Sequence, residues 1–233
     1  MNTATEIANS SVFVVIPAFN EESQIRNTVE PLIEEGYSVV VVDDCSSDNT
    51  KEKLQGLPVY YLRHEVNLGQ GAALQTGMEF ALKHCCEYIV HFDADGQHNY
   101  KEIPLLLAAL KKEHADVALG TRFKRKEDVF AIPLLRRIIL KAAIVVNGLL
   151  TGLWLSDAHN GFRMFTREAA QKIRLTENRM AHATEIIWLI KQHNLKVVEV
   201  PVHITYTVYS KLKGQKPSNA LNILIDLLLN RIF

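Results

Sequence analysis

Residues 12–44 read VFVVIPAFNEESQIRNTVEPLIEEGYSVVVVDD, and this stretch decides the fold. Two β-branched runs, Val12 to Ile16 and Val39 to Val42, flank a helical pattern from Glu22 to Glu35 that Gly36 closes. Neither run alternates apolar with polar residues, which is typical of strands buried on both faces. Because a helix separates the two strands, we expect them to pair in parallel through a right-handed crossover. The stretch therefore predicts the first β–α–β unit of an α/β sheet.

The same alternation of strands and helices continues along the chain. Further strands are expected at residues 59–62, 88–92, 117–120, 162–165 and 197–202, and helices after the N-cap Asp48 and at residues 71–84, 103–112, 133–155 and 184–193. The predicted fold class is therefore α/β, with a doubly wound, mostly parallel sheet that carries helices on both faces. In such sheets ligands bind at the carboxyl ends of the strands.

The composition is that of an ordinary globular protein. Among 233 residues, 26 Lys and Arg balance 26 Asp and Glu, so a nucleic-acid binder driven by positive charge is disfavoured. No linker rich in Pro, Gly or Ser divides the chain, which predicts a single domain over residues 1–233. The 3 cysteines form an odd set without a disulfide framework, which favours a reducing, cytoplasmic compartment.

The chain shows neither a signal peptide nor a clean transmembrane stretch. Its start, Met1 to Ser11, is polar and lacks the basic and apolar regions of a secretory signal. Its longest apolar stretch, Ile138 to Leu155, is interrupted by Lys141 and Asn147 and falls short of the roughly 20 clean residues that a span needs. We expect that stretch to form an amphipathic or buried helix.

Polar residues gather directly after three of the predicted strands. They are Pro17 to Glu21, then Asp43 with Asp44, then Asp93 to Gln97. Loop solvation or helix capping would explain any one of these groups alone. Because the carboxyl ends of parallel strands meet at one edge of a sheet, their recurrence predicts one shared site.

Asp93 and Asp95 lie two residues apart at the end of the apolar run Tyr88 to Phe92. In an extended segment both carboxylates would point to the same side and share a cation, and Gln97 adds another oxygen at the same spacing. Hard oxygen ligands select Mg²⁺ or Mn²⁺. An isolated Asp-x-Asp is more often a turn, but the buried strand before it favours a metal site that would serve a diphosphate leaving group.

Two other segments carry weaker signals. Asn67 to Ala72 is rich in glycine, but a Rossmann fingerprint would need glycine where Leu74 stands, so close approach of backbone to a base or sugar fits better. A basic stretch is either a solvated surface or a binding surface for phosphate and an anionic lipid head group; it comprises Arg122, Lys124, Arg125, Lys126, Arg136 and Arg137.

In this order, the segments resemble those of glycosyltransferase family 2, the inverting nucleotide-sugar enzymes of the GT-A fold, and in particular polyprenyl-phosphate sugar transferases of the dolichyl-phosphate mannose synthase type. The resemblance runs from Val14 to about Gln215. It is carried by the segments Pro17 to Glu21, Asp43 to Thr50, Asn67 to Gly71, Asp93 to His98, Gly120 to Arg122, and Asp157 to Arg163.

The resemblance implies a division of roles among the site residues. It implies that the nucleotide sugar is bound by Pro17, Phe19, Glu21, Asp44, Gly71, Asp93 and Ala94. It implies a Mg²⁺ or Mn²⁺ ion held by Asp93, Asp95 and Gln97, and an acceptor phosphate bound by Arg122, Arg136, Ser210 and Lys211. The residues expected to serve catalysis directly are Asp95, Arg122 and Asp157.

The second half of the chain departs from the mannose synthase pattern. Relatives of that branch carry an arginine and a glycine shortly before the Ser-Lys pair, whereas Thr205 to Lys211 reads TYTVYSK. This points away from mannose and dolichol and toward bacterial cell-envelope branches. Residues 12–121 are then expected to bind the donor and the metal, and residues 122–216 the acceptor. Residues 217–233 carry an apolar stripe at helical spacing, which predicts an amphipathic helix for peripheral membrane contact, core packing or a subunit contact.

The expected function is an inverting, metal-dependent transfer of a hexose from a UDP- or GDP-linked sugar to a polyprenyl phosphate at the cytoplasmic membrane face, in cell-envelope glycan synthesis. One alternative sends the sugar to a glycan hydroxyl, with Asp157 or Glu185 as the base. An NAD-dependent oxidoreductase is disfavoured by the incomplete glycine pattern, and a non-catalytic nucleotide-sugar-binding module by the metal motif. The sugar, the base and an oligomeric assembly stay open.

Overall fold

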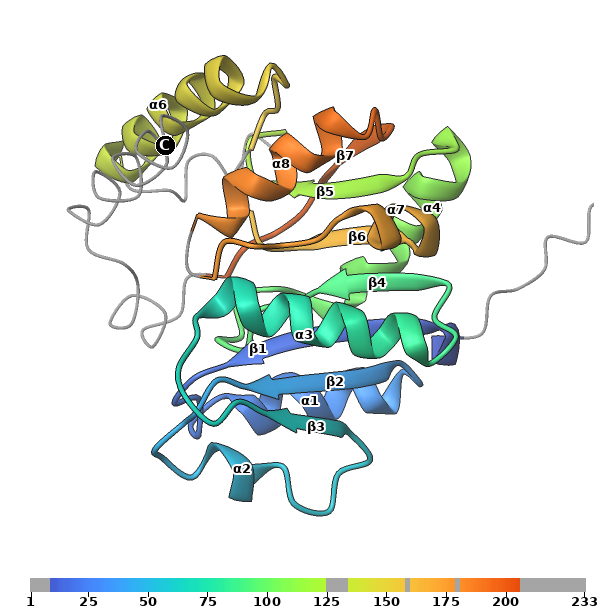
Figure 1. Ribbon diagram of the computed structural model, residues 1–233, viewed down its shortest axis with the longest axis vertical. Helices are drawn as coiled ribbons and strands as arrows, with labels where there is room; N and C mark the ends of the chain where they lie inside the picture. Colours follow the sequence, from blue (N-terminus) through green and yellow to red (C-terminus); the bar gives the residue numbers. More distant parts are fainter. Residues whose placement is uncertain (1–8, 125–133, 158–159, 179–180, 206–233) are drawn as a thin grey trace, which may run out of the picture.

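The computed structural model describes residues 9–124, 134–157, 160–178 and 181–205 of the chain (Figure 1). At its centre lies one 7-stranded sheet with the strand order β3-β2-β1-β4-β6-β5-β7. In chain order the strands are β1 (Val12–Ala18), β2 (Ser38–Asp43), β3 (Tyr60–Arg63), β4 (Tyr88–His91), β5 (Val117–Thr121), β6 (Arg163–Thr166) and β7 (Val197–Pro201).

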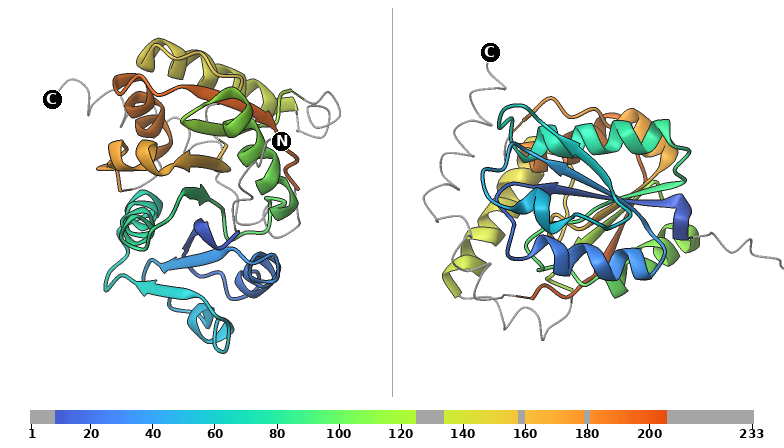
Figure 2. Two further views of the ribbon diagram at one scale, coloured as in Figure 1. Left: turned by 90° about the vertical axis from the view of Figure 1, so that its right-hand side faces the viewer. Right: turned by 90° about the horizontal axis from the view of Figure 1, so that it is seen from below.

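Helices cover both faces of this sheet. They are α1 (Ile25–Glu34), α2 (Thr50–Lys53), α3 (Gln70–Lys83), α4 (Ile103–Glu113), α6 (Leu134–Thr151), α7 (Arg167–Lys172) and α8 (His182–Gln192), with short 3₁₀ turns at Asn9–Ser11 and Tyr100–Glu102. α1 and α4 pack on one face, and α3, α7 and α8 pack on the other (Figure 2). The predicted α/β class, with helices on both faces of a mostly parallel sheet, is confirmed.

β6 is the strand that departs from parallel pairing. It runs antiparallel to both β4 and β5, with Arg163 opposite His91 on one side and Leu119 on the other. The chain reaches β6 through residues that lie at the carboxyl ends of the parallel strands, since Gly161 lies beside Asp93. β6 must therefore begin at the edge where its neighbours end, which fixes its opposite direction.

The continuous apolar runs form the core. The side chains from Val12 to Ile16 are at most 4% exposed, and those from Val39 to Val42 are at most 1% exposed, because helices cover both faces of these strands. Successive residues divide between two apolar clusters: Val12 and Val14 pack toward α1 and α4, and Phe13 and Val15 toward α3. This rigid sheet sets the positions of the loops at its edges.

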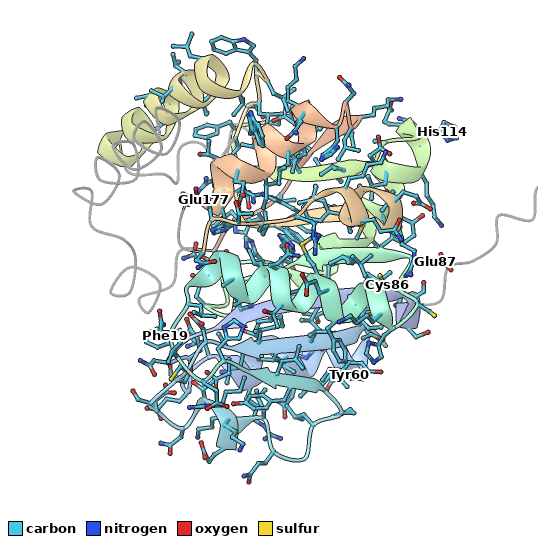
Figure 3. The ribbon with its side chains drawn as sticks, viewed as in Figure 1. Phe19, Tyr60, Cys86, Glu87, His114 and Glu177 are labelled. Atoms are coloured by element: carbon cyan, nitrogen blue, oxygen red, sulfur yellow. The ribbon has the colours of Figure 1, made fainter. Side chains whose placement is uncertain are left out.

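The two ends of the parallel strands carry different parts of the chain. Phe19 and Glu177 lie at the carboxyl ends of the parallel strands, whereas Cys86, Glu87 and His114 lie at the opposite end of the sheet (Figure 3). The polar motifs that follow β1, β2 and β4 all lie at the carboxyl ends of the strands.

Some element boundaries differ from the prediction. α6 stops at Thr151 rather than Leu155, because Gly152 adopts a positive φ of 73° and the Thr151 hydroxyl accepts a hydrogen bond from the Leu153 amide. The short helix α7 follows β6 directly and was not predicted. Within the described part of the chain, no helix has both the length and the apolar character to cross a bilayer.

Candidate active site

The loops after β1 and β2 are hydrogen-bonded to each other at the carboxyl ends of these strands. The Asp44 amide donates to the Ala18 carbonyl at 2.8 Å, and the Glu21 amide donates to the Thr50 hydroxyl at 2.8 Å. Phe19, directly after β1, is 43% exposed, whereas Glu21 is buried. The fold therefore brings together the two segments that are predicted to bind the nucleotide sugar, and the exposed Phe19 ring lies beside them.

The neighbouring carboxylates Asp43 and Asp44 do different work. Asp43 is fully buried and accepts hydrogen bonds from the Ser46 amide, the Tyr61 hydroxyl and the Arg63 guanidinium. Burial and the hydrogen bond to Asp43 raise the pKa of Tyr61 to about 12. Asp43 is thus a structural residue that fixes the end of β2 against β3.

Asp44 organises the loop that leads to α3. Its carboxylate accepts from the Leu68 amide at 2.9 Å and the Gly69 amide at 2.6 Å, and it pairs with His64 Nδ1 at 2.8 Å. His64 reaches Thr76 of α3 through its other ring nitrogen at 2.9 Å. The Asp44 carboxylate, which is predicted to bind the nucleotide, therefore also holds the glycine-rich loop in place.

Gly71 stands where α3 meets the loop before α8. A Cβ atom on Gly71 would lie 1.9 Å from the Glu177 carbonyl oxygen and 2.9 Å from His182 Cβ. The Ala72 amide also donates to the Asn178 carbonyl at 3.2 Å. Close packing of two backbones thus requires glycine at residue 71. Its position near the base stays a prediction.

Asp93 and Asp95 follow β4, but they do not lie in an extended segment as the sequence suggested. Residues 94 and 95 form a turn, and Gly96 takes a φ of 72°. Asp95 accepts from the Gln97 amide at 3.1 Å and from Gln97 Nε2 at 2.8 Å. The extended geometry was wrong; a tight turn, stabilised by Asp95 and Gln97, brings the groups together.

The electrostatics of this turn suit a cation. Burial and the negative charge of Asp93 raise the pKa of Asp95 to about 6. Burial alone would also raise the pKa of Asp93, but its interactions with His98, His182 and Arg163 lower it overall. Two carboxylates that repel each other in a partly buried turn would be stabilised by a divalent ion between them.

Few side chains at this turn could act as metal ligands. Within the described residues, no three His, Cys, Asp or Glu side chains converge on one point to hold a metal. A metal site here would therefore depend on Asp93, Asp95 and an amide, and the Gln97 side chain would supply an oxygen with its amide turned over. Oxygen ligands of this kind fit Mg²⁺ or Mn²⁺.

Neighbouring elements hold the turn of residues 93–97 from both sides. The Thr28 hydroxyl of α1 donates to the Ala94 carbonyl at 3.0 Å. On the other side the Thr205 amide donates to the Gln97 carbonyl at 3.0 Å, and His98 forms an isolated β-bridge with Ile204. After β7, residues 204 and 205 thus contact the turn of residues 93–97.

Arg122 and Asp157 form a bidentate ion pair at the end of β5. Arg122 Nε lies 2.7 Å from Asp157 Oδ2, and Nη2 lies 2.8 Å from Oδ1; the Arg122 amide donates to the same carboxylate at 3.1 Å. Arg122 is 7% exposed and Asp157 3% exposed. Arg122 is therefore a buried, oriented guanidinium, and the interpretation of this residue as part of a solvated basic surface is wrong.

A second polar network lies beside this pair. The Thr121 and Ser156 hydroxyls are 2.8 Å apart, and Ser156 donates to Glu199 of β7 through its amide and its hydroxyl. Lys124 also pairs with Glu199, at 3.3 Å. These contacts fasten the segment before Asp157 to the end of β5.

Glu185, considered as a base in the hydroxyl alternative, is engaged elsewhere. Its Oε1 accepts from the Thr176 amide and hydroxyl, and its Oε2 accepts from the Glu177 amide at 3.0 Å. Asp157 is held by Arg122 as described. Both carboxylates therefore serve to position loops or charges.

Several residues at the site received no individual role from the resemblance, although Gln70, His98 and Arg163 lie in segments that carry it. Gln70 and His98 contact the two oxygens of Asp93, and Arg163, His91 and His182 form a buried group on the α8 side of the sheet. Burial lowers the pKa of Arg163 to about 10 and that of His91 well below its usual range. Gln70 lies within the glycine-rich segment and His98 within the segment from Asp93 to His98, but the contact of either residue with Asp93 depends on the fold.

Part of the predicted acceptor side lies outside the described residues. Ser210, Lys211 and the expected helix at residues 217–233 belong to that part, as do Arg125 and Lys126 of the basic stretch. Arg136 lies on α6, but its side chain is not among those described. Their predicted roles stay predictions.

A mostly parallel sheet with an antiparallel β6, a carboxylate turn after β4 and a buried arginine after β5 define a glycosyltransferase of the GT-A fold. More narrowly, the chain belongs to glycosyltransferase family 2: the family described as "Glycosyl transferase family 2" matches residues 13–174.

Individual relatives agree with this placement. A UDP-N-acetylglucosamine–dolichyl-phosphate N-acetylglucosaminyltransferase of Methanococcus voltae is 28% identical over 243 residues, which cover 96% of this chain and 97% of the relative. A dolichol-phosphate mannosyltransferase of Pyrococcus furiosus is 34% identical over 221 residues, which cover 88% of this chain and 60% of the relative. The predicted resemblance to polyprenyl-phosphate sugar transferases is confirmed.

A solved structure shows the same fold. Glucosyl-3-phosphoglycerate synthase from Mycobacterium tuberculosis, crystallised with Mn²⁺ and UDP-glucose, matches with a TM-score of 0.65 and 19% identity over 96% of this chain and 80% of that chain. At this identity the likeness shows the fold alone.

Proposed function

We propose that the protein transfers a hexose or hexosamine from a nucleotide diphosphate sugar to a polyprenyl phosphate, with a divalent metal ion. The carrying observation is the buried bidentate pair of Arg122 and Asp157, which presents an oriented guanidinium at the same sheet edge as the carboxylate turn. The two named relatives act with dolichyl phosphate and differ in the sugar. The acceptor class is therefore better supported than the identity of the sugar.

On the donor side, the nucleotide sugar would bind the residues after β1 and β2, with the Phe19 ring and Glu21 at its base and ribose. Asp93, Asp95 and Gln97 would hold Mg²⁺ or Mn²⁺. The ion would neutralise charge that develops on the diphosphate leaving group. Mn²⁺ in the crystals of the structural neighbour supports a divalent ion without deciding between the two metals.

On the acceptor side, Asp157 holds the Nε and Nη2 edge of Arg122. This pairing fixes the orientation of the guanidinium at the end of β5. A guanidinium binds phosphate oxygens through its N–H groups. A phosphate monoester is already anionic near neutral pH, so attack on the anomeric carbon needs positioning and charge stabilisation more than a base.

The hydroxyl alternative is less well supported. A glycan hydroxyl must lose its proton during attack, which calls for a carboxylate poised to accept it. Asp157 binds Arg122 with both oxygens, and Glu185 binds the backbone of residues 176–177 with both oxygens. These contacts support the phosphate acceptor.

A polyprenyl phosphate lies in a membrane, so the protein would work at a membrane surface. The basic residues from Lys124 to Lys141 and the apolar stripe of residues 217–233 support peripheral association at the cytoplasmic face. The product would serve cell-envelope glycan synthesis.

Purified protein with Mn²⁺ and polyprenyl phosphate vesicles tests the proposal. UDP-N-acetylglucosamine, UDP-glucose and GDP-mannose are offered in turn, and release of the nucleotide diphosphate is measured with formation of the glycolipid. Arg122→Ala should abolish transfer, whereas Arg26→Ala, which removes an exposed arginine of α1, should not. Transfer to a glycan hydroxyl that survives Arg122→Ala, with none to the lipid phosphate, would overturn the proposal.

A further inference from the structure

The carboxylate of Asp93 is held from two sides by side chains outside the proposed metal ligands. Gln70 Nε2, from the first turn of α3, donates to Oδ1 at 3.1 Å. His98 Nε2 lies 2.9 Å from Oδ2. Each oxygen therefore accepts one hydrogen bond and keeps a second lone pair for another partner.

The hydrogen bond from His98 fixes the identity of its donor atom. A carboxylate oxygen can only accept, so His98 Nε2 carries the hydrogen. Nδ1 is buried and has no hydrogen-bond partner among the described residues. Asp93 is thus the one hydrogen-bonding partner that the described structure gives this ring.

Aromatic packing holds the His98 ring in place. Its centroid lies 5.4 Å from that of Phe92 and 5.1 Å from that of Phe162. The side chain is 3% exposed, and the backbone of His98 is bridged to Ile204. The ring has no room to turn away from Asp93 without disturbing this packing.

A third contact closes the space around Asp93. The α carbon of Gly161 comes so near that a Cβ atom there would lie 2.6 Å from Asp93 Oδ2. The carboxylate is therefore confined by Gln70, His98 and Gly161, and its orientation is set before any ligand binds.

We propose that His98 is a positioning residue that aligns Asp93 Oδ2 for the divalent ion, and that Gln70 does the same for Oδ1. This inference rests on the proposed function, in which Asp93 binds the metal. Partners that hydrogen-bond to ligating carboxylates orient them, and their loss lowers metal affinity by roughly 10- to 100-fold.

The test measures Mn²⁺ binding in the presence of UDP by electron paramagnetic resonance, with thermal unfolding of the metal-free protein as a check on folding. His98→Phe keeps an aromatic ring between Phe92 and Phe162 but removes the donor. We expect Mn²⁺ affinity to fall roughly 10- to 100-fold, and His98→Gln to restore part of it. His84→Phe is the matched control, because His84 stacks on Phe80 at 3.9 Å far from Asp93, and it should bind Mn²⁺ like the unchanged protein.

Gln70→Met extends the test to the other oxygen and replaces His98→Phe should that variant not fold; a several-fold loss of affinity is expected. Unchanged Mn²⁺ affinity in either folded variant would overturn the inference for the residue concerned. If the unchanged protein itself binds no Mn²⁺ in the presence of UDP, the proposed function fails first, so the two failures are distinguishable.

Discussion

Gly161 lies so close to Asp93 that a single added methyl group would come within 2.6 Å of the Asp93 Oδ2 atom. The atom it would meet is the end of a side chain, which can move at small cost to the fold. Gly161→Ala should therefore displace the carboxylate, lower Mn²⁺ affinity roughly tenfold or more and change the free energy of unfolding by less than about 1 kcal/mol. Calorimetric titration and urea denaturation measure the two effects; a loss of stability without a loss of metal affinity would contradict this relation.

Gly71 should behave in the opposite way. Its added Cβ would meet the backbone carbonyl of Glu177 at 1.9 Å, and a backbone cannot move aside as a side chain does. Gly71→Ala is expected to lower the free energy of unfolding by about 1–3 kcal/mol or more, measured by urea denaturation. Gly56→Ala is the control: its φ of 80° strains the backbone, but among the described residues no atom lies within 4 Å of the new Cβ. Gly71→Ala as stable as the unchanged protein would show that this packing is looser than described.

Breaking the ion pair of Arg122 and Asp157 should cost more than removing it whole. Asp157→Ala leaves a buried guanidinium without its carboxylate, and a single truncation of such a pair typically costs about 3–5 kcal/mol. The double variant Arg122→Met with Asp157→Ala removes both charges and should be more stable than Asp157→Ala alone, although inactive. Urea denaturation of Arg122→Met, Asp157→Ala and the double variant gives the coupling energy; additive effects would show that the pair contributes little.

The hydroxyl of Thr28 on α1 should stabilise the turn of residues 93–97. Thr28→Val keeps the shape of the side chain but leaves the Ala94 carbonyl without this donor, which should cost about 1–3 kcal/mol of unfolding free energy. Thr28→Ser keeps the hydroxyl and should lose less. If Thr28→Ser is instead the less stable of the two variants, the methyl group, and not the hydrogen bond, matters at this position.

The three cysteines should divide two to one in their reactivity. Cys85 is exposed and Cys45 half-buried, whereas Cys86 is buried and its pKa is raised, chiefly by that burial. A disulfide-exchange reagent at pH 8 should label Cys45 and Cys85 quickly and Cys86 only after denaturation. Cys86→Ala should leave the rapidly labelled number unchanged; three rapid thiols in the unchanged protein would contradict the packing.

Much of the fold follows from local pattern. The runs at Val12 to Ile16 and Val39 to Val42 predict buried parallel strands, and the strand-end motifs predict one shared edge, because both depend on residues near in sequence. The reversal of β6 does not follow in this way, since it depends on where the chain lies after α6. The contact of Gln70 with Asp93 could not be predicted for the same reason: Gln70 is 23 residues away, and its contact exists only once β4 and the start of α3 meet.

The position of β6 also bears on the order of folding. β1, β2, β3 and β4 pair with one another using residues 12–91 alone, so this half of the sheet can form while the rest of the chain is still being synthesised. β5 does not join β4 directly; it waits for β6, which starts at Arg163 and inserts between them. Until then the outer edge of β4 presents unpaired backbone groups, a surface that other extended chains can add to. Newly made protein should therefore be most prone to aggregate before residues 163–166 emerge from the ribosome.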